Sequence, residues 1–370
     1  MIWKKIVKKL RVSRLGVALK ASPLGVAILR NKRNKKNLSK EKAYAVMRDF
    51  GVGDLPEEEK EKIYRDMLDC AKKFHFSFVE YFQFNLKDKT DAERSEYISD
   101  NDRVRLTEEF NDPYNLDIFE NKAKTAQTFA AFFNREYLVF TDKKDAEKLA
   151  QFLKKQGTAI IKPIGSAGGH GIRIVEAGED SRKTADALIG EFCRSKYCGG
   201  IAEELIHQDD RMKAFHAQSV NTIRVPTIRL DDRTVVFHPV LRVGRGDSVI
   251  DNTSAGGIIC PLDNETGVVL AARDRAGNEY EKNPNTGEPL VGVQVPEWDS
   301  AVAFVKRLVQ VVPSNRYTGW DIALSKDKGW MLVEANARGQ MGSQIALQKG
   351  YRKEIDGYRK ELGLPPSMNI

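Results

Sequence analysis

A β-hairpin predicted over residues 320–336 constrains the fold of this chain more than any other feature. Two apolar segments flank a polar turn at 325–329 that ends in glycine, a pattern typical of paired antiparallel strands. Glu334 and Asn336 lie two residues apart on an extended segment, so their side chains share a face, and Asp321 on the partner strand can meet them there. Three oxygen-bearing side chains held in this way suit Mg2+ carrying a polyphosphate. A simpler interpretation treats them as ordinary strand-end and turn residues.

The length and composition indicate a folded chain with more than one core. With 370 residues, of which 41% are hydrophobic, the sequence can build two or three subdomains and differs from disordered and fibrous sequences. The cysteines form no CxxC pair and have no histidines at zinc spacing, which argues against a disulfide framework or a structural zinc; they are Cys70, Cys193, Cys198 and Cys260. A reducing, cytosolic location is the simplest expectation.

Positive charge is concentrated in the N-terminal segment. Residues 1–40 contain 13 Lys and Arg and no Asp or Glu, so removing these charges from the net charge of +8 leaves −5 on the other 330 residues. A surface that binds nucleic acid over the whole chain is therefore not expected.

Residues 1–38 alternate short apolar clusters with these basic residues. None of the clusters approaches the ~18–20 apolar residues needed to span a bilayer, and no cleavage-site pattern of a signal peptide follows. The segment is expected to be a basic amphipathic one that contacts an anionic membrane face or an acidic partner. A solvated helical arm without a partner is the alternative.

Helices are predicted in the part of the chain that follows. Ser39 is a suitable N-cap for a helix over 40–50, Pro56 followed by three glutamates opens a helix toward Phe76, and Thr90 begins a shorter one. The aromatic residues between 74 and 84 are expected to form the core of this helical region.

Strands are predicted after residue 136. Segments rich in Val, Ile and Thr are interrupted by helices over about 181–194 and 299–311, which favours a mixed α/β region of mainly antiparallel character. A further helix is expected from Thr141 to about 156, and residues 263–297 form an excursion rich in Gly, Asn and Pro. The predicted strands lie at 137–140, 158–162, 171–175, 200–203, 221–230, 234–243, 256–262 and in the hairpin.

The segment 160–172 combines a lysine with a glycine-rich turn. A strand delivers Lys162, and Ser166, Gly168 and Gly169 follow before the next strand, so backbone amides can fold over phosphates while the ammonium group supplies a point charge. The pattern is not a P-loop, which needs GxxxxGK[ST] leading into a helix, and it is not a Rossmann fingerprint, because a strand follows it. A glycine-rich hairpin without a ligand is the alternative.

Two further motifs place polar groups near these segments. Residues 201–206 can form an extended hinge that offers backbone groups to an adenine edge, and Asp210 follows closely enough to reach ribose hydroxyls. Arg224 and Arg242 are expected on neighbouring strands, and an Asn and a Ser beside a glycine pair follow at 252–257. Together these groups suit an oxyanion and phosphate clamp. Surface arginines on an exposed sheet face are the alternative.

In this order, the motifs resemble those of the ATP-grasp superfamily. A strand lysine, a Gly-rich loop, an acidic hinge and an Asp followed by Glu-x-Asn occur in the superfamily's sequence order, the last as D-x12-E-x-N in the hairpin. SVNTIR at 219–224, DNTSAGGI at 251–258 and GWDIA at 319–323 resemble the sugar-transfer associated ATP-grasp family, which is related to α-L-glutamate ligases and found near polysaccharide genes. The resemblance covers about residues 121–349.

The resemblance implies an α+β (mixed α/β) ATP-grasp fold with an α-helical N-terminal region and mainly antiparallel sheets. Four parts are expected: the basic segment 1–38, a helical domain at 39–135, a small lid subdomain at 136–207, and a large subdomain at 208–370 that carries the metal site. ATP and Mg2+ are the implied cofactors, and Mn2+ can replace Mg2+.

The resemblance also implies roles for individual residues. Lys162 would bind the ATP phosphates, with Lys122 as a second contact in an Asn-Lys pair where the family has Asp-Lys. The lid over the phosphates would contain Ser166, Gly168 and Gly169. Around the nucleoside, the implied groups are Glu203 in the hinge, the Glu204 carbonyl and Ile206 amide at adenine, and Asp210 at the ribose. The metal would be held by Asp321, Glu334 and Asn336, and the γ-phosphate and acyl phosphate by Arg224, Arg242, Asn252, Gly256 and Gly257.

The activity that the resemblance implies is ATP-dependent ligation of a carboxylate to an amine. The carboxylate would attack the γ-phosphate to give an acyl phosphate and ADP, and the amine would then displace phosphate. Positioning and charge neutralisation would carry catalysis, and no general base is assigned. A kinase on the same fold and a nucleotide-binding module without turnover are the alternatives.

The substrates are expected to be small molecules. They would be a cell-surface polysaccharide precursor, such as a uronic-acid-type sugar that receives an amino acid, or an amino-acid-derived metabolite. Arg338, Gln340 and Gln344 follow the metal strand and can either contact the substrate carboxylate or begin the C-terminal helix. No nucleic-acid partner is expected. The expected location is cytoplasmic, with peripheral contact at the inner membrane face through residues 1–38.

Overall fold

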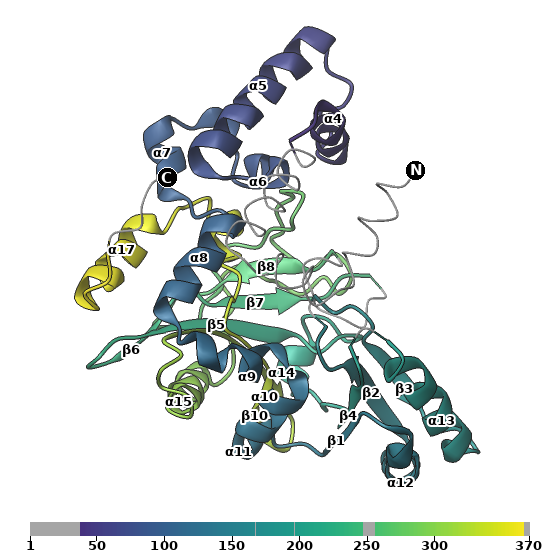
Figure 1. Cartoon of the computed structure of the whole chain (residues 1–370). Coiled ribbons are helices and arrows are strands. Elements are labelled where there is room, and N and C mark those ends of the chain that lie inside the picture. Colours follow the sequence, from purple (N-terminus) through teal and green to yellow (C-terminus); the bar gives the residue numbers. More distant parts are fainter. Residues whose placement is uncertain (1–37, 167, 196, 247–255, 366–370) are drawn as a thin grey trace, which may run out of the picture. The chain divides into compact units, whose positions relative to one another are not determined.

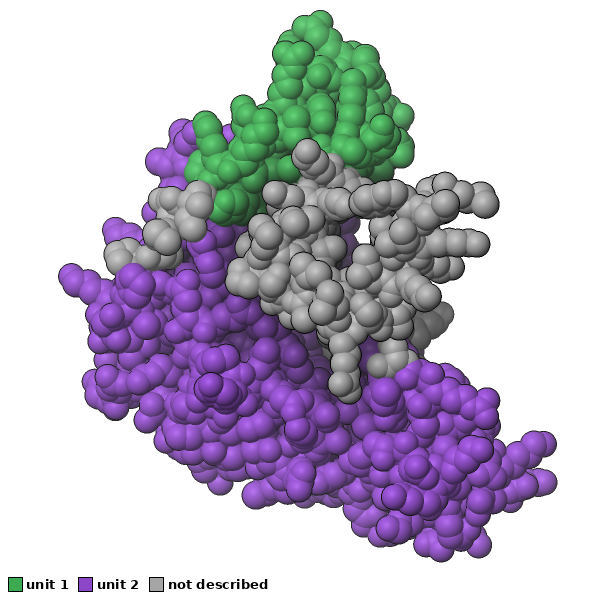
Figure 2. Space-filling view, viewed as in Figure 1, with its two compact units in different colours: residues 1–89, 370 green, residues 90–369 purple. Residues whose placement is uncertain are grey.

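The computed structural model describes residues 38–365, apart from 167, 196 and 247–255. The chain divides into two compact units, which Figure 2 distinguishes by colour: residues 1–89 with 370, and residues 90–369. The predicted basic segment 1–38 lies outside the described residues except for Leu38. The four-part division of the chain remains a prediction.

The described part of the first unit is helical. Its elements are α4 (Lys40–Asp49), α5 (Glu57–Phe74), α6 (Phe78–Gln83) and the 3-10 turn η1 (Leu86–Asp88) (Figure 1). Ser39 caps α4 as predicted, because its hydroxyl oxygen accepts a hydrogen bond from the Lys42 amide at 3.2 Å. α5 ends two residues earlier than expected, since His75 adopts a left-handed φ of +60°. The predicted aromatic core is buried at Phe76, Phe78, Tyr81 and Phe84.

Short helices open the second unit. Thr90 caps α7 (Asp91–Glu96) in a capping box with Glu93. The next elements are α8 (Asp100–Phe110), the 3-10 turn η2 (Pro113–Asn115), α9 (Leu116–Glu120), α10 (Lys122–Thr128) and α11 (Ala130–Phe133). The rings of Phe119 and Phe129 pack edge-on against Trp320, with centroids 6.3 and 5.4 Å away. These helices therefore cover the predicted hairpin.

A four-stranded antiparallel sheet follows, in the order β1 (Tyr137–Phe140), β4 (Gly200–Glu204), β2 (Thr158–Pro163) and β3 (Arg173–Glu176). Two helices, α12 (Ala146–Gln156) and α13 (Ser181–Phe192), bury their apolar residues against it (Figure 1). The helix predicted to start at Thr141 begins instead with the 3-10 turn η3 (Lys143–Asp145), because Asp142 accepts the Lys144 amide and acts as the cap.

A six-stranded antiparallel sheet forms the rest of the second unit's β-structure. Its order is β10 (Gly329–Asn336), β9 (Tyr317–Ser325), β5 (Thr222–Arg229), β7 (Val240–Val243) and β8 (Ile258–Pro261), and β6 (Thr234–Val236) pairs with β5. The single strand predicted at 234–243 is divided into β6 and β7, because His238 adopts a left-handed φ of +48° between them. The mixed α+β class with antiparallel sheets is confirmed.

Helices pack on this sheet and close the chain. α15 (Trp298–Val309) contacts β5, β6 and β10 and contributes Phe304 and Leu308 to the main hydrophobic core. The other helices of this part are α14 (Asp210–Lys213), α16 (Ser343–Leu347) and α17 (Arg352–Glu361). The predicted excursion at 263–297 contains no helix and no strand, and isolated bridges such as Val268 to Gln294 hold it together.

Candidate functional site

A cavity of about 760 Å3 in the second unit brings together most of the predicted site residues. Its lining comes from α10, the glycine-rich loop after β2, the segment after β4, and strands β5, β7, β9 and β10. The predicted residues that line it are Lys122, Lys162, Gly168, Gly169, Glu203, Glu204, Ile206, Asp210, Arg224, Arg242, Asp321, Glu334 and Asn336.

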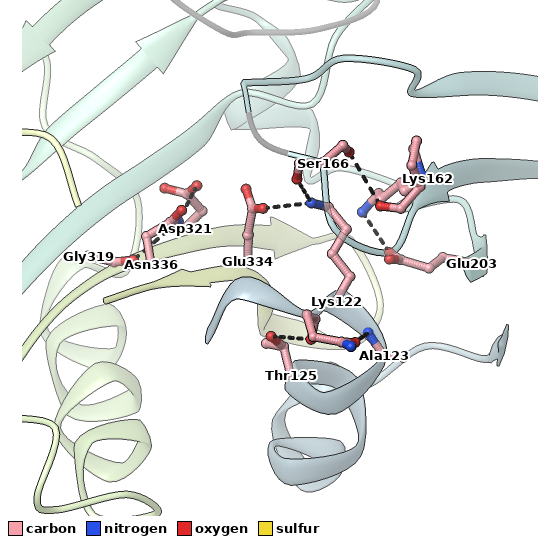
Figure 3. Close-up of polar contacts among 12 residues, drawn as sticks. Lys122, Ala123, Thr125, Lys162, Ser166, Glu203, Gly319, Asp321, Glu334 and Asn336 are labelled. Carbon is pink, nitrogen blue, oxygen red and sulfur yellow. Dashed lines mark hydrogen bonds and ion pairs between the residues drawn. The ribbon is translucent and has the colours of Figure 1, made fainter. Parts of the chain in front are cut away.

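The hairpin of β9 and β10 forms one wall of the cavity. Glu334 lies opposite Asp321 and Asn336 lies opposite Gly319, because the register shifts between Leu332 and Glu334. Without this bulge, residue 333 rather than Glu334 would face Asp321, so the irregularity re-aims the carboxylate. Figure 3 shows Asp321, Glu334 and Asn336 side by side, with the Asn336 Nδ2 3.4 Å from Asp321 Oδ2.

Asp321 is a buried carboxylate held by two arginines. It is only 1% exposed, and Arg224 donates to both of its oxygens, with Nη2 2.8 Å from Oδ2. The Arg242 Nη2 lies 3.1 Å from the same oxygen, and Thr222 Oγ1 accepts two hydrogen bonds from Arg242, at 2.7 and 3.0 Å. Burial opposes ionisation of Asp321, but the charges of both arginines outweigh it and hold the pKa of this carboxyl below its usual value.

The hairpin donors fit a hard divalent cation only in part. Among the described residues, no cluster of three or more His, Cys, Asp and Glu side chains is arranged to hold a metal. The hairpin instead offers two carboxylates and the side-chain amide of Asn336, all oxygen donors of the kind that Mg2+ prefers. Mg2+ keeps several further oxygen ligands, so this donor set fits a metal that arrives with phosphate oxygens.

Lys162 belongs to a second buried charge network. Its Nζ lies 2.8 Å from Glu203 Oε2, and Arg135 donates to the same oxygen from Nε and Nη2 at 2.9 and 2.7 Å. Burial, only partly offset by Glu203, lowers the pKa of Lys162. Burial also opposes ionisation of Glu203, but Arg135 and Lys162 together hold the pKa of this carboxyl below its usual value.

Arg135 was not predicted from the sequence. It also donates to the Leu332 carbonyl of β10 at 2.6 Å, so it ties the four-stranded sheet to the hairpin. Its partner Glu203 lies 68 positions away in the sequence. The residues around Arg135 therefore contain no local pattern from which this ion pair could be predicted.

Lys122 connects α10 to the opposite wall of the site. Its Nζ lies 3.1 Å from Glu334 Oε1 and donates to the Ser166 carbonyl, as Figure 3 shows. Asn121 caps α10, because its side-chain oxygen accepts the Ala123 and Lys124 amides at 3.0 and 3.1 Å. The Asn that replaces the family's Asp before this lysine therefore still serves as a helix cap.

The glycine-rich loop presents backbone to the cavity. Gly168 and Gly169 line it with left-handed φ values of +69° and +79°, which favour glycine. The hydroxyl of Ser166 is buried and donates to the Pro163 carbonyl at 3.3 Å. Gly168 and Gly169 contribute backbone, whereas the Ser166 side chain stabilises the turn.

The segment after β4 also contributes mainly backbone. The Glu204 carboxylate is engaged outside the cavity, accepting the Glu136 amide at 2.9 Å and pairing with Lys328 at 2.6 Å. Asp210 lies at the start of α14 and pairs with Lys326 at 2.8 Å, with its side chain 72% exposed. Leu205 and Ile206 complete this part of the lining.

Several predicted residues lie elsewhere. Gly256 and Gly257 are not among the described residues that line the cavity, and Asn252 lies outside the described residues. Gln344 is buried and its amide bonds both backbone groups of Ile98, at 3.0 and 3.1 Å, so it stabilises the fold rather than meeting a substrate.

Arg338 and Gln340 do line the cavity, and so does Arg103 of α8, which was not predicted. Arg338 pairs with Glu108 at 2.6 Å and with Glu120, while its backbone carbonyl accepts from Arg103. This side of the cavity therefore has two guanidinium groups that are far apart in sequence and are held by acidic partners.

We predict that Glu203→Gln lowers the free energy of unfolding by about 3–5 kcal/mol, because it leaves two buried cations without their shared carboxylate. Urea denaturation measures the change. The control is Glu147→Gln, which removes one partner of an exposed ion pair with Arg182 and should change stability by less than about 1 kcal/mol. Equal effects of the two substitutions would contradict the assignment of the Glu203 network as a structural centre.

A comparison with known families identifies the chain. The sequence profile described as sugar-transfer associated ATP-grasp matches residues 101–359, well over half of the chain. A search of curated proteins found no match.

The chain also resembles solved structures at low identity. D-alanyl-alanine synthetase A from Vibrio cholerae is 13% identical with a TM-score of 0.38, over 59% of this chain and 55% of that chain. The ATP-grasp ligase PsnB, complexed with the precursor peptide PsnA2 and AMPPNP, is 18% identical with a TM-score of 0.41, over 69% of this chain and 62% of that chain. N5-carboxyaminoimidazole synthetase from Staphylococcus aureus is 10% identical with a TM-score of 0.39, over 67% of this chain and 52% of that chain.

This chain thus matches little more than half of the length of these solved structures, between 52% and 62%. The family assignment depends on the profile match, which spans both sheets and the hairpin. The chain belongs to the sugar-transfer associated ATP-grasp family and has an α+β ATP-grasp fold.

Proposed function

We propose that the chain is an ATP-dependent, ADP-forming carboxylate-amine ligase that works through an acyl phosphate. The observation that carries the proposal is the position of Asp321 between Arg224 and Arg242, in the same cavity as Lys122 and Lys162. Transfer of a phosphoryl group to an anionic acceptor needs positive charges around the reacting phosphate and oxygen ligands for a metal. The four basic side chains and the Asp321 carboxylate of the hairpin would supply these groups.

The nucleotide would occupy the lysine side of the cavity. Lys162 and Lys122 would contact its phosphates, and the backbone of Gly168 and Gly169 would close over them. The segment 204–206 would pair with the adenine edge, while Asp210 would accept from the ribose hydroxyls. Apolar walls suited to a purine ring come from Ile160, Ile172, Ile174 and Phe133.

The hairpin would hold Mg2+, or Mn2+ in its place, through Asp321, Glu334 and Asn336. When bound, the metal would neutralise charge on the phosphates. Lys122 pairs with Glu334 at 3.1 Å, so a lysine of the phosphate site and a metal-site carboxylate are already linked.

The first chemical step would join two anions. A substrate carboxylate oxygen attacks the γ-phosphorus, the bond to the ADP oxygen breaks, and an acyl phosphate forms. Arg224 and Arg242 reduce the repulsion between the reacting groups, because their charges lie on neighbouring strands facing the same cavity. In the second step an amine nitrogen attacks the acyl carbon and phosphate leaves.

The charge of the cavity supports anionic substrates. Among the described residues, eight basic residues line it against five acidic ones: Arg103, Lys122, Lys162, Lys213, Arg224, Arg242, Lys326 and Arg338 against Glu203, Glu204, Asp210, Asp321 and Glu334. This excess favours a polyphosphate together with a carboxylic acid. Arg338 and Gln340 would hold the acid, which we propose is a cell-surface polysaccharide precursor or an amino-acid-derived metabolite.

We predict that Glu334→Gln abolishes turnover with little loss of stability, since Glu334 is about one third exposed. Asp321→Asn should abolish turnover and also destabilise the protein, because it leaves two partly buried arginines without a carboxylate. The assay is ADP and orthophosphate release from mixtures of acids, amines and Mg-ATP, with urea denaturation in parallel.

The matched control for these variants is Glu288→Gln, at an exposed position in the 263–297 excursion, which should retain wild-type activity. Full activity of Glu334→Gln would contradict the proposed metal site. Release of ADP that depends on an acceptor, with the phosphoryl group retained on the product and no need for an amine, would identify a kinase instead.

We also propose that residues 1–38 bind an anionic membrane face, which would place the enzyme peripherally at the cytoplasmic side of the inner membrane. The support is the concentration of basic residues there, at about 1 kcal/mol of attraction per Lys or Arg near such a surface. Within residues 38–365, apart from 167, 196 and 247–255, no helix is long and apolar enough to cross a bilayer.

Flotation with phosphatidylserine vesicles tests the membrane proposal. The full chain should float and a variant lacking residues 1–38 should stay at the bottom, and raising the salt concentration should release the full chain. Equal flotation of the two proteins would overturn the membrane proposal. Neither result of the flotation experiment bears on the ligase proposal.

A further inference from the structure

A buried histidine and serine form a pair at the edge of the cavity. His216 is fully buried and Ser219 is 4% exposed, and the His216 Nδ1 lies 2.8 Å from Ser219 Oγ. The other ring nitrogen, Nε2, lies 2.8 Å from the Gly246 carbonyl oxygen. The SVNTIR motif begins with this serine, which the proposed nucleotide site does not use.

The surroundings fix the proton positions of the pair. The Gly246 carbonyl can only accept, so the neutral His216 ring carries its proton on Nε2 and donates it there. Nδ1 is then the acceptor, and the Ser219 hydroxyl donates to it; the Ser219 amide, 3.3 Å away, points to the same nitrogen. The lone pairs of Ser219 Oγ therefore remain able to accept a proton from another group.

The chain around the pair is built to hold it. A Cβ at Gly244 would lie 2.3 Å from Ser219 Oγ and 2.4 Å from His216 Nδ1, so only glycine lets the chain pass them directly after β7 ends. The 263–297 excursion secures both neighbouring loops: Asn283 donates to the Phe215 carbonyl at 2.7 Å, and Asn285 accepts the Gly246 amide at 2.8 Å.

The pair also lies near the proposed reacting groups. Ser219 lines the cavity together with its neighbours Ala217, Gln218 and Val220. Three residues later, Thr222 pairs across the strands with Arg242 and accepts its guanidinium hydrogen bonds. Ser219 therefore lies in the wall of the cavity that Arg242 and Asp321 also line, three residues before β5 begins.

We propose that Ser219 is a catalytic residue for the amine step, and that His216 positions it and receives its proton. The inference depends on the proposed ligase function. As the amine nitrogen forms its bond to the acyl carbon and the carbon-oxygen bond to phosphate breaks, the nitrogen loses one proton to Ser219 Oγ. The serine's own proton passes to His216 Nδ1, which gives an imidazolium that still donates to Gly246, and solvent removes the proton afterwards.

The alternative is that the pair only closes the turn at 216–219. A structural pair would affect both chemical steps equally when removed, whereas a proton relay would affect only the amine step. Hydroxylamine separates the two outcomes, because its weakly basic nitrogen becomes acidic enough on attack to lose its proton directly to water, so hydroxamate forms without a proton acceptor from the protein.

The experiment compares Ser219→Ala and His216→Gln with the wild type. Glucuronate, galacturonate and the common amino acids are first screened as acids with Mg-ATP and hydroxylamine, and the active acid is then paired with amines. Both variants should form hydroxamate at the wild-type rate, while amide formation should fall by about 100-fold or more with an unchanged KM for ATP. The control is Thr227→Val, which deletes the buried hydroxyl on β5 that accepts from Trp320 on the neighbouring strand β9, and it should leave the ratio of the two rates unchanged.

Three other results would contradict either the proton relay or the ligase function. Parallel loss of hydroxamate and amide would show a structural pair and overturn the relay while leaving the ligase function intact. Unchanged rates in both variants would overturn the relay as well. If the wild type forms no hydroxamate with any acid, the proposed ligase function fails, and the relay fails with it.

Discussion

The buried ion pairs of Asp321 with Arg224 and Arg242 are the interaction on which the site depends. They join β9, β5 and β7, so three strands of the six-stranded sheet meet at a single carboxylate. Removing charges from water costs several kcal/mol per ion, and well-packed apolar residues would often be at least as stable. Their placement at a cavity wall is therefore better explained by chemistry than by stability.

A second network of buried charges connects the four-stranded sheet to the same cavity. Arg135, Lys162 and Glu203 are buried together, and Arg135 reaches the Leu332 carbonyl of β10. Lys122 then links α10 to Glu334 and to the glycine-rich loop. Two sheets, a helix and a loop are thus positioned around one cavity by charges that also suit a metal-bound polyphosphate.

The proposed relay assigns a role to a segment outside these networks. The 263–297 excursion has no helix or strand, yet its asparagines fix the loops that carry His216 and Gly246. A long irregular segment of this kind is commonly functional. Here it would keep a proton acceptor aligned at the edge of the site.

Local patterns allowed much of the fold and part of the site arrangement to be predicted from the sequence. The hairpin follows from two apolar segments around a Gly turn, and the Ser39 and Thr90 caps follow from residue type and spacing. The bulge that places Glu334 opposite Asp321 could not be predicted, because it depends on pairing between strands. Arg135 and the contact of Gly244 with His216 and Ser219 likewise depend on residues distant in sequence.

The structure also altered expectations about individual side chains. Glu204 and Ser166 stand in the predicted motifs, but their side chains bind other partners: the Glu204 carboxylate is held by the Glu136 amide and Lys328, and the Ser166 hydroxyl by the Pro163 carbonyl. Gln344 was a candidate for substrate contact because it follows the predicted metal-binding segment, yet it bonds the backbone of Ile98. Sequence position alone cannot distinguish a side chain that faces the cavity from one that faces the core.

The central claim is that the reaction passes through an acyl phosphate, and the most direct test is to measure whether an oxygen of the acid's carboxyl group ends up in the released orthophosphate. The active acid, labelled with 18O in its carboxyl group, is incubated with the wild-type protein, Mg-ATP and the amine, and the released orthophosphate is analysed by mass spectrometry. An acyl phosphate requires that each orthophosphate carries one labelled oxygen from the acid. Orthophosphate without the label, while ADP and amide accumulate, would contradict the account.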